Sequence, residues 1–94
     1  MKARLIVHNL SELTHYQKVL LNREIYGYAD NSNNNTYHYK REGILAKMPN
    51  FRLLKGAYII RKEDLIKIKP IYKRYNVKYD IYEIIIDPSK FKKV

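Results

Sequence analysis

Polar and apolar residues alternate along Ala3–Leu10, which is the pattern of a half-buried β-strand. Apolar residues then recur at helical spacing over residues 13–20. Ser11 precedes this segment as the expected N-cap, with Glu12 in the first turn, where the helix dipole favours a carboxylate. Gly27 favours the end of the helix. We therefore expect a strand followed by a helix at the start of the chain.

The middle of the chain contains one polar segment and one further strand pattern. Residues Asp30–Asn35 are all turn-forming and predict a solvated loop. Residues Thr36–Arg41 have strand propensity, whereas residues 43–55 show no clear period. Alternate residues of the predicted strand share one face: Tyr37, Tyr39 and Arg41.

The second half of the chain predicts a strand, a helix and a strand. Residues Ala57–Arg61 form the first of these strands, and Val77–Asp87 forms the last and strongest one. Residues 62–75 begin with acidic and end with basic side chains, which favours a helix. Pro70 inside this helix costs about 3 kcal/mol unless the helix is kinked. The alternation within Leu65–Lys69 leaves a strand as the alternative.

The order of elements predicts the fold class. An order β-α-β-β-α-β is typical of the α+β ferredoxin-like fold, a four-stranded antiparallel sheet with two helices on one face. The length allows one domain. We expect it to span residues 1–88, followed by a short basic tail at residues 89–94.

The last strand is apolar on both of its faces. Ile81 and Ile85 face one way, and Tyr82, Ile84 and Ile86 face the other. Because both faces of this strand carry apolar residues, we expect the sheet face opposite the helices to be covered as well. We expect a homodimer in which a second copy supplies that cover.

The chain is rich in positive charge and in tyrosine. It has 19 Lys/Arg against 9 Asp/Glu, a net charge of +10, and 10 of its 94 residues are Tyr. Most of this charge lies in residues 48–94, with 12 Lys/Arg and 5 Asp/Glu. Cations neutralise phosphates and aromatic rings stack on bases, so the combination favours DNA or RNA as partner. The codons of Lys, Ile, Tyr and Asn are AT-rich, so a low-GC genome is an alternative source of this composition.

Two segments resemble signatures of the RNA recognition motif. Residues Leu5–Leu10 are similar to its first-strand signature, and Lys55–Ile60 to its third-strand signature. In that family, aromatic side chains of these strands stack bases on the open sheet face. The resemblance implies this role for Tyr58, while Ile6 stands in the place of the first-strand aromatic. We then expect Tyr58→Ala to weaken single-strand binding without disturbing the fold.

Several kinds of chemistry lack their residue patterns. The chain has no Cys, no Gly-rich phosphate loop and no Gly-x-Ser-x-Gly elbow. His8, His15 and His38 are not at metal-ligand spacing. No run of 18 apolar residues is present. We therefore expect a cytoplasmic, non-enzymatic protein without metal, cofactor or membrane association.

The candidate contacts with nucleic acid are basic residues and tyrosines on the predicted strands and beside them. Lys and Arg would contact phosphates, and tyrosines would stack on bases. Residues 37–41 and 52–58 bring the two kinds together. The candidate residues are Arg4, Tyr37, Tyr39, Lys40, Arg41, Arg52, Lys55 and Tyr58.

Two other functions share these features. The charge also suits an inhibitor of viral or mobile-element type that docks on an acidic host protein. Residues 37–41 contain the His, Tyr, Lys and Arg with which a metal-independent RNase can work, as in small toxins, with His38 as the acid–base group. An acidic protein partner and RNA cleavage therefore remain alternatives.

Overall fold

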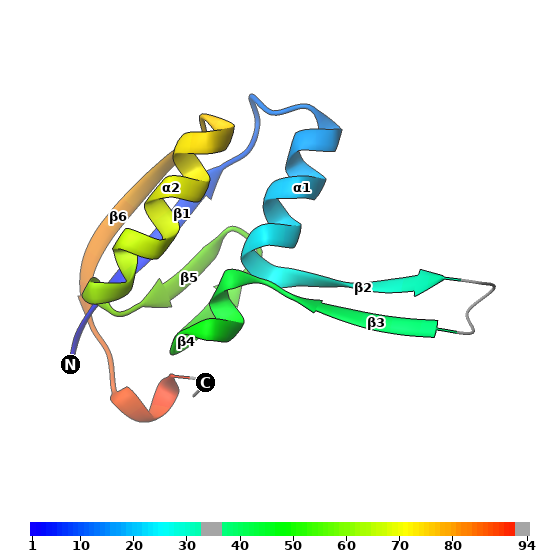
Figure 1. Ribbon diagram of the computed structural model, residues 1–94. Coiled ribbons are helices and arrows are strands. Elements are labelled where there is room, and N and C mark those ends of the chain that lie inside the picture. The colour runs from blue at the N-terminus through cyan, green and yellow to red at the C-terminus, as the bar shows by residue number, and fades with distance from the viewer. Residues whose placement is uncertain (33–36, 92–94) are drawn as a thin grey trace.

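Two α-helices and six strands make up most of the computed structural model, which describes residues 1–32 and 37–91 (Figure 1). Short 3-10 turns occupy Ile44–Lys47, Lys62–Asp64 and Pro88–Lys90. The strands and helices in chain order are β1 (Lys2–Asn9), α1 (His15–Tyr26), β2 (Gly27–Ser32), β3 (Tyr37–Glu42), β4 (Asn50–Leu54), β5 (Ala57–Ile60), α2 (Leu65–Tyr75) and β6 (Lys78–Ile85).

The main sheet has four antiparallel strands in the order β4-β5-β1-β6. Ile6 at the centre of β1 lies opposite Tyr58 of β5 and opposite Ile81 of β6. Both helices pack on the same face of this sheet (Figure 1), where Ile6 and Tyr58 join Leu21 of α1 and Ile68 of α2 in the core. The protein thus has the expected α+β architecture with a four-stranded antiparallel sheet and two helices.

The strands β2 and β3 form a separate two-stranded sheet, a hairpin that projects from the body of the molecule (Figure 1). Placing 36–41 in the main sheet was therefore wrong, and β4 occupies that place instead. Residues 30–32 of the expected loop belong to β2, and residues 33–35 lie outside the described residues. Gly27 starts the hairpin with φ 81°, and a Cβ there would lie 2.3 Å from the Arg41 carbonyl oxygen. Only glycine fits this junction.

Helix α1 begins later than expected. Its N-cap is Thr14, whose hydroxyl accepts a hydrogen bond from the Gln17 amide, while the Gln17 side chain accepts one from the Thr14 amide. Ser11 instead lies in a turn in which its amide donates to Asn9 Oδ1. The Thr-x-x-Gln spacing is that of a capping box, and it outweighed the Ser11 signal.

Helix α2 continues through Pro70, as the helical interpretation expected. A 3-10 turn at Lys62–Asp64 leads into it, and Asn76 in the left-handed conformation ends it. Asp64 is buried at this N-terminus, where Arg61 donates to it through Nε at 2.8 Å and Nη2 at 3.2 Å. The strand alternative for Leu65–Lys69 was wrong.

The sheet face opposite the helices carries a second, smaller apolar cluster. Phe91, 8% exposed, packs there with Ala3 and Ile59, and Ile84 and Ile86 border them. A segment expected to be a tail therefore covers part of this face.

Candidate nucleic-acid interface

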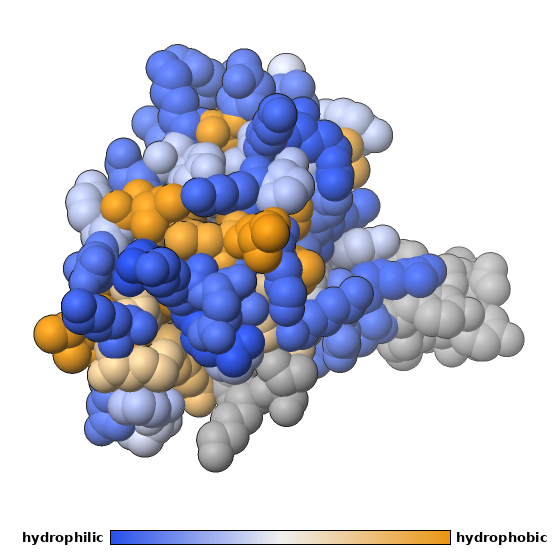
Figure 2. Space-filling model, turned by 60° about the vertical axis from the view of Figure 1, so that its left-hand side comes forward, coloured by the Kyte–Doolittle hydropathy of each residue, from blue (hydrophilic) through white to orange (hydrophobic). Residues whose placement is uncertain are grey.

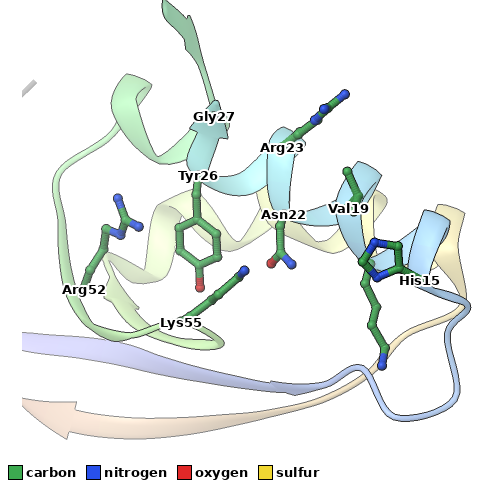
Figure 3. A pocket seen from close by; sticks show the side chains of 9 residues that line it. His15, Val19, Asn22, Arg23, Tyr26, Gly27, Arg52 and Lys55 are labelled. Carbon is green, nitrogen blue, oxygen red and sulfur yellow. The ribbon is translucent and has the colours of Figure 1, made fainter. Parts of the chain in front are cut away.

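A groove of about 540 Å³ lies between helix α1 and the turn that joins β4 to β5. Tyr26 and Asn22 point from α1 toward Lys55, and Arg52 lies on the opposite side of the Tyr26 ring from Asn22 (Figure 3). The groove is lined by His15, Lys18, Val19, Asn22, Arg23, Tyr26, Gly27, Arg52 and Lys55.

One face of α1 forms one wall of the groove. The other lining residues of α1 lie three, four, seven, eight and eleven positions after His15, which is the spacing of one helical face. The opposite wall consists of Arg52 from β4 and Lys55 from the following turn. Two segments about 30 residues apart therefore build the site together.

The groove is strongly basic. Four of its nine lining residues are Lys or Arg, and none of the nine is Asp or Glu. Some of the described cations elsewhere pair with carboxylates, for example Lys78 with Glu12 at 3.3 Å, whereas others, such as Lys69 and Lys73, have no carboxylate partner among the described residues. Lys18 and Lys55 have no such partner among the described residues. A surface with this charge attracts polyanions.

Aromatic rings hold two of the groove's guanidinium groups. Arg52 lies over the Tyr26 ring with its Cζ atom 4.4 Å from the centroid, and Arg23 lies over Tyr28 at the same distance. The Tyr26 hydroxyl accepts a hydrogen bond of 2.8 Å from the Gly56 amide, which ties the β4–β5 turn to α1. Burial raises the pKa of Tyr26, so this hydroxyl stays protonated at neutral pH.

The structure brings two of the expected contact residues together in this groove, Arg52 and Lys55. Arg4 lies elsewhere, because its guanidinium is largely buried, donates to the Ala3 carbonyl and lies 3.6 Å from Glu83. Arg4 is therefore engaged within the fold and not presented at the groove.

Tyr58 was expected on the open sheet face, and this expectation was wrong. It is fully buried on the helix face, and its hydroxyl lies 2.7 Å from that of Tyr72. His8 continues the network through Nδ1, 2.6 Å from the same Tyr72 oxygen. Stacking of Tyr58 on a base would require the core to open.

The remaining candidates belong to the β2–β3 hairpin. Lys40 and Arg41 are exposed there, and Arg41 lies opposite Tyr28 in the hairpin register. This register places them next to the groove, since Tyr28 follows Gly27. Tyr37 and Tyr39 belong to β3, but their side chains, like that of His38, lie outside the described residues.

The sequence reasoning missed the α1 side of the groove. His15, Lys18 and Asn22 occupy one helical face, so a polar stripe at helical spacing was the available signal.

The described residues contain no cluster of three or more His, Cys, Asp or Glu side chains that could hold a metal ion. None of the helices described is long and apolar enough to cross a membrane.

The positions implied by the RNA recognition motif resemblance carry no aromatic ring toward the open face. Leu5 and Val7 lie opposite Ile59 and Ala57, on the face away from the helices. The open face of the two central strands is therefore aliphatic. No protein-family model, curated protein or solved structure matches the chain.

Proposed function

We propose that this protein is a small, non-enzymatic nucleic-acid-binding protein that contacts phosphates through the groove between α1 and the β4–β5 turn. The observation that carries the proposal is the groove lining, with four Lys/Arg side chains and no carboxylate. Neutralising phosphates and releasing their counterions supplies most of the sequence-independent affinity for nucleic acid.

The arrangement of Arg52 supports this role. Its guanidinium is stacked on Tyr26, so its side chain is already ordered before a ligand arrives. A stacked guanidinium keeps its N–H groups in the plane of the fork, where they can meet two phosphate oxygens. Less conformational entropy is then lost on binding.

We also infer that the fold is ferredoxin-like. If β1, β4, β5 and β6 are the four strands of that fold, α1 follows the first and α2 follows the third. The β2–β3 hairpin is then an insertion between α1 and β4. On this interpretation the core has the order β-α-β-β-α-β, and the basic groove lies at one side of it.

A matched pair of variants tests the groove. R52E/K55E reverses two groove charges, and K69E/K73E makes the same net change on α2, which does not line the groove. Fluorescence anisotropy with labelled DNA and RNA should show R52E/K55E weakening binding about tenfold or more, and clearly more than the control. Equal losses in both variants would contradict a groove site.

The same titration separates the alternatives. If the wild type fails to bind either nucleic acid but retains one acidic protein after nuclease treatment, the inhibitor function holds instead. If the nucleic acid is shortened without added metal and His38→Ala stops this, the protein is an RNase. The proposal expects neither outcome.

We further propose a homodimer formed through β6. This strand lies at the edge of the sheet, and its Ile81, Tyr82 and Ile85 are 36%, 51% and 82% exposed. Hydrophobic side chains gather on the side of the molecule that Figure 2 brings forward, where β6 and α2 lie in Figure 1. The β6 strand of a second copy would form hydrogen bonds with the unpaired backbone groups of this edge, so that the same surface of each copy meets in the contact.

Light scattering tests the dimer. It should report a dimer for the wild type and a monomer for I81K/I85K.

A further inference from the structure

The two described tyrosine rings at the groove, Tyr26 and Tyr28, each have an arginine over one face. Arg52 covers a face of Tyr26, and Tyr58 stands perpendicular to the same ring, with centroids 6.2 Å apart. The hydrogen bond from the Gly56 amide holds the Tyr26 hydroxyl in place. A base could stack on that face of Tyr26 only by displacing Arg52.

Tyr28, at the base of the hairpin, is in a similar position, because Arg23 lies over its ring. The more exposed tyrosines lie away from the groove lining. Tyr16 is 70% exposed on α1, and Tyr82 is 51% exposed on β6, but neither lines the groove. Among tyrosines with described side chains, none at the groove has a ring without an arginine over it.

From this we infer that the groove takes the sugar-phosphate backbone of a double-helical nucleic acid and not the bases of a single strand. The inference rests on the proposed function and specifies its substrate class. The site presents four cations, two of them stacked on tyrosine rings, and the small imidazole of His15 is the one exposed ring among its lining residues. Such a site reads phosphate density and helix shape and no base sequence.

The sources of affinity for a single strand and for a duplex also favour the duplex at this site. Proteins that bind single strands gain roughly fivefold to more than a hundredfold in affinity from each stacked base. A groove whose described tyrosines carry arginines, with His15 as its one exposed ring among the described lining residues, forgoes most of this gain. A duplex carries one phosphate charge per about 1.7 Å of its axis, so it offers more charge to the same cations than one strand does.

The test compares a 16-base-pair DNA duplex, the matching RNA duplex and each separate strand at two salt concentrations. We expect at least one duplex to bind about tenfold more tightly than either of its strands at the same salt concentration. The better of the DNA and RNA duplexes identifies the natural form of the helix.

A second comparison tests base stacking directly. Oligo-dT and an abasic oligodeoxynucleotide of the same length carry the same phosphates, so we expect their affinities to agree within about twofold. Tighter binding of oligo-dT, or of single strands over duplexes, overturns this inference. If R52E/K55E still weakens that binding, the proposed function stands. Absence of binding to every probe overturns both.

Discussion

The Arg52 guanidinium lies over the ring of Tyr26, 4.4 Å from its centre, and thereby joins β4 to the last turn of α1. The same tyrosine accepts a hydrogen bond from the Gly56 amide in the β4–β5 turn. One side chain therefore positions both the arginine and the turn that carries Lys55. The two walls of the groove are held together at this point.

Tyr26→Phe tests the contribution of that hydroxyl. The variant keeps the ring under Arg52 but leaves the partly buried Gly56 amide without its acceptor. We expect the free energy of unfolding to fall by about 0.5–1.5 kcal/mol. Urea denaturation measures it, and a Tyr26→Phe protein as stable as the wild type would show that the bond contributes nothing.

The N-cap of α1 gives a prediction with an internal control. Thr14→Ala removes the hydroxyl that caps the Gln17 amide, and it should cost about 1 kcal/mol of stability. Ser11→Ala should leave stability nearly unchanged, because only the Ser11 backbone amide takes part in its turn. Thermal unfolding of both variants checks this. A larger loss for Ser11→Ala would assign the cap to Ser11.

His8 makes stability depend on pH on the acidic side. Burial lowers the pKa of His8 below its usual 6.5, and its buried Nε2 has no hydrogen-bond partner among the described residues. The unfolded chain therefore binds the proton more readily, so the stabilisation is present above about pH 6.5 and is lost as pH falls toward the folded pKa.

Denaturant unfolding between pH 7.5 and 5 measures this effect. We expect His8→Gln to flatten the dependence, while His15→Gln, at an exposed position, leaves it as in the wild type. A dependence that follows His15 instead would contradict the role of His8.

The Tyr58–Tyr72 pair predicts sensitivity at the alkaline end. Burial raises the pKa of both phenols above the ordinary value of 10. The unfolded chain ionises them first, so stability should fall as pH rises above about 10. Tyr72→Phe should lower stability by about 1–3 kcal/mol, since it leaves Tyr58 and His8 without their shared partner. Ultraviolet titration of tyrosine follows the ionisation.

Tyr58→Ala has a different expected outcome from the one that the sequence suggested. Removing a fully buried ring costs about 3–5 kcal/mol, a large part of the stability of a small domain. We expect urea denaturation to show the free energy of unfolding lowered by about this amount. A Tyr58→Ala variant whose stability lies within about 1 kcal/mol of the wild type would contradict the packing described for the core.

Local patterns predicted the elements whose signals are strong. The alternation in β1, the charges at the ends of α2 and the apolar run of β6 identified all three, even across Pro70. Strand propensity also found β3, but propensity does not identify a strand's partner. The strand β4 is short and has no regular alternation of burial, so only its pairing with β5 reveals it.

The site was harder to predict for a physical reason. Alternation shows that Ile6 and His8 share one face and Leu5 and Val7 the other, but both faces are partly apolar. The sequence therefore did not determine which face of β1 and β5 meets the helices, and Tyr58 was assigned to the wrong one. The sequence identified Arg52 and Lys55 as candidate contacts, but their position opposite α1 depends on the tertiary fold.

The salt dependence of duplex binding tests the central claim most directly. In R52Q/K55Q, two phosphate contacts of the groove are removed, so the slope of log affinity against log salt should become shallower by about two. The control K69Q/K73Q, with the same loss of charge on α2, should keep the wild-type slope. A slope that is unchanged in R52Q/K55Q, or equally reduced in both variants, would contradict a phosphate-binding groove between α1 and the β4–β5 turn.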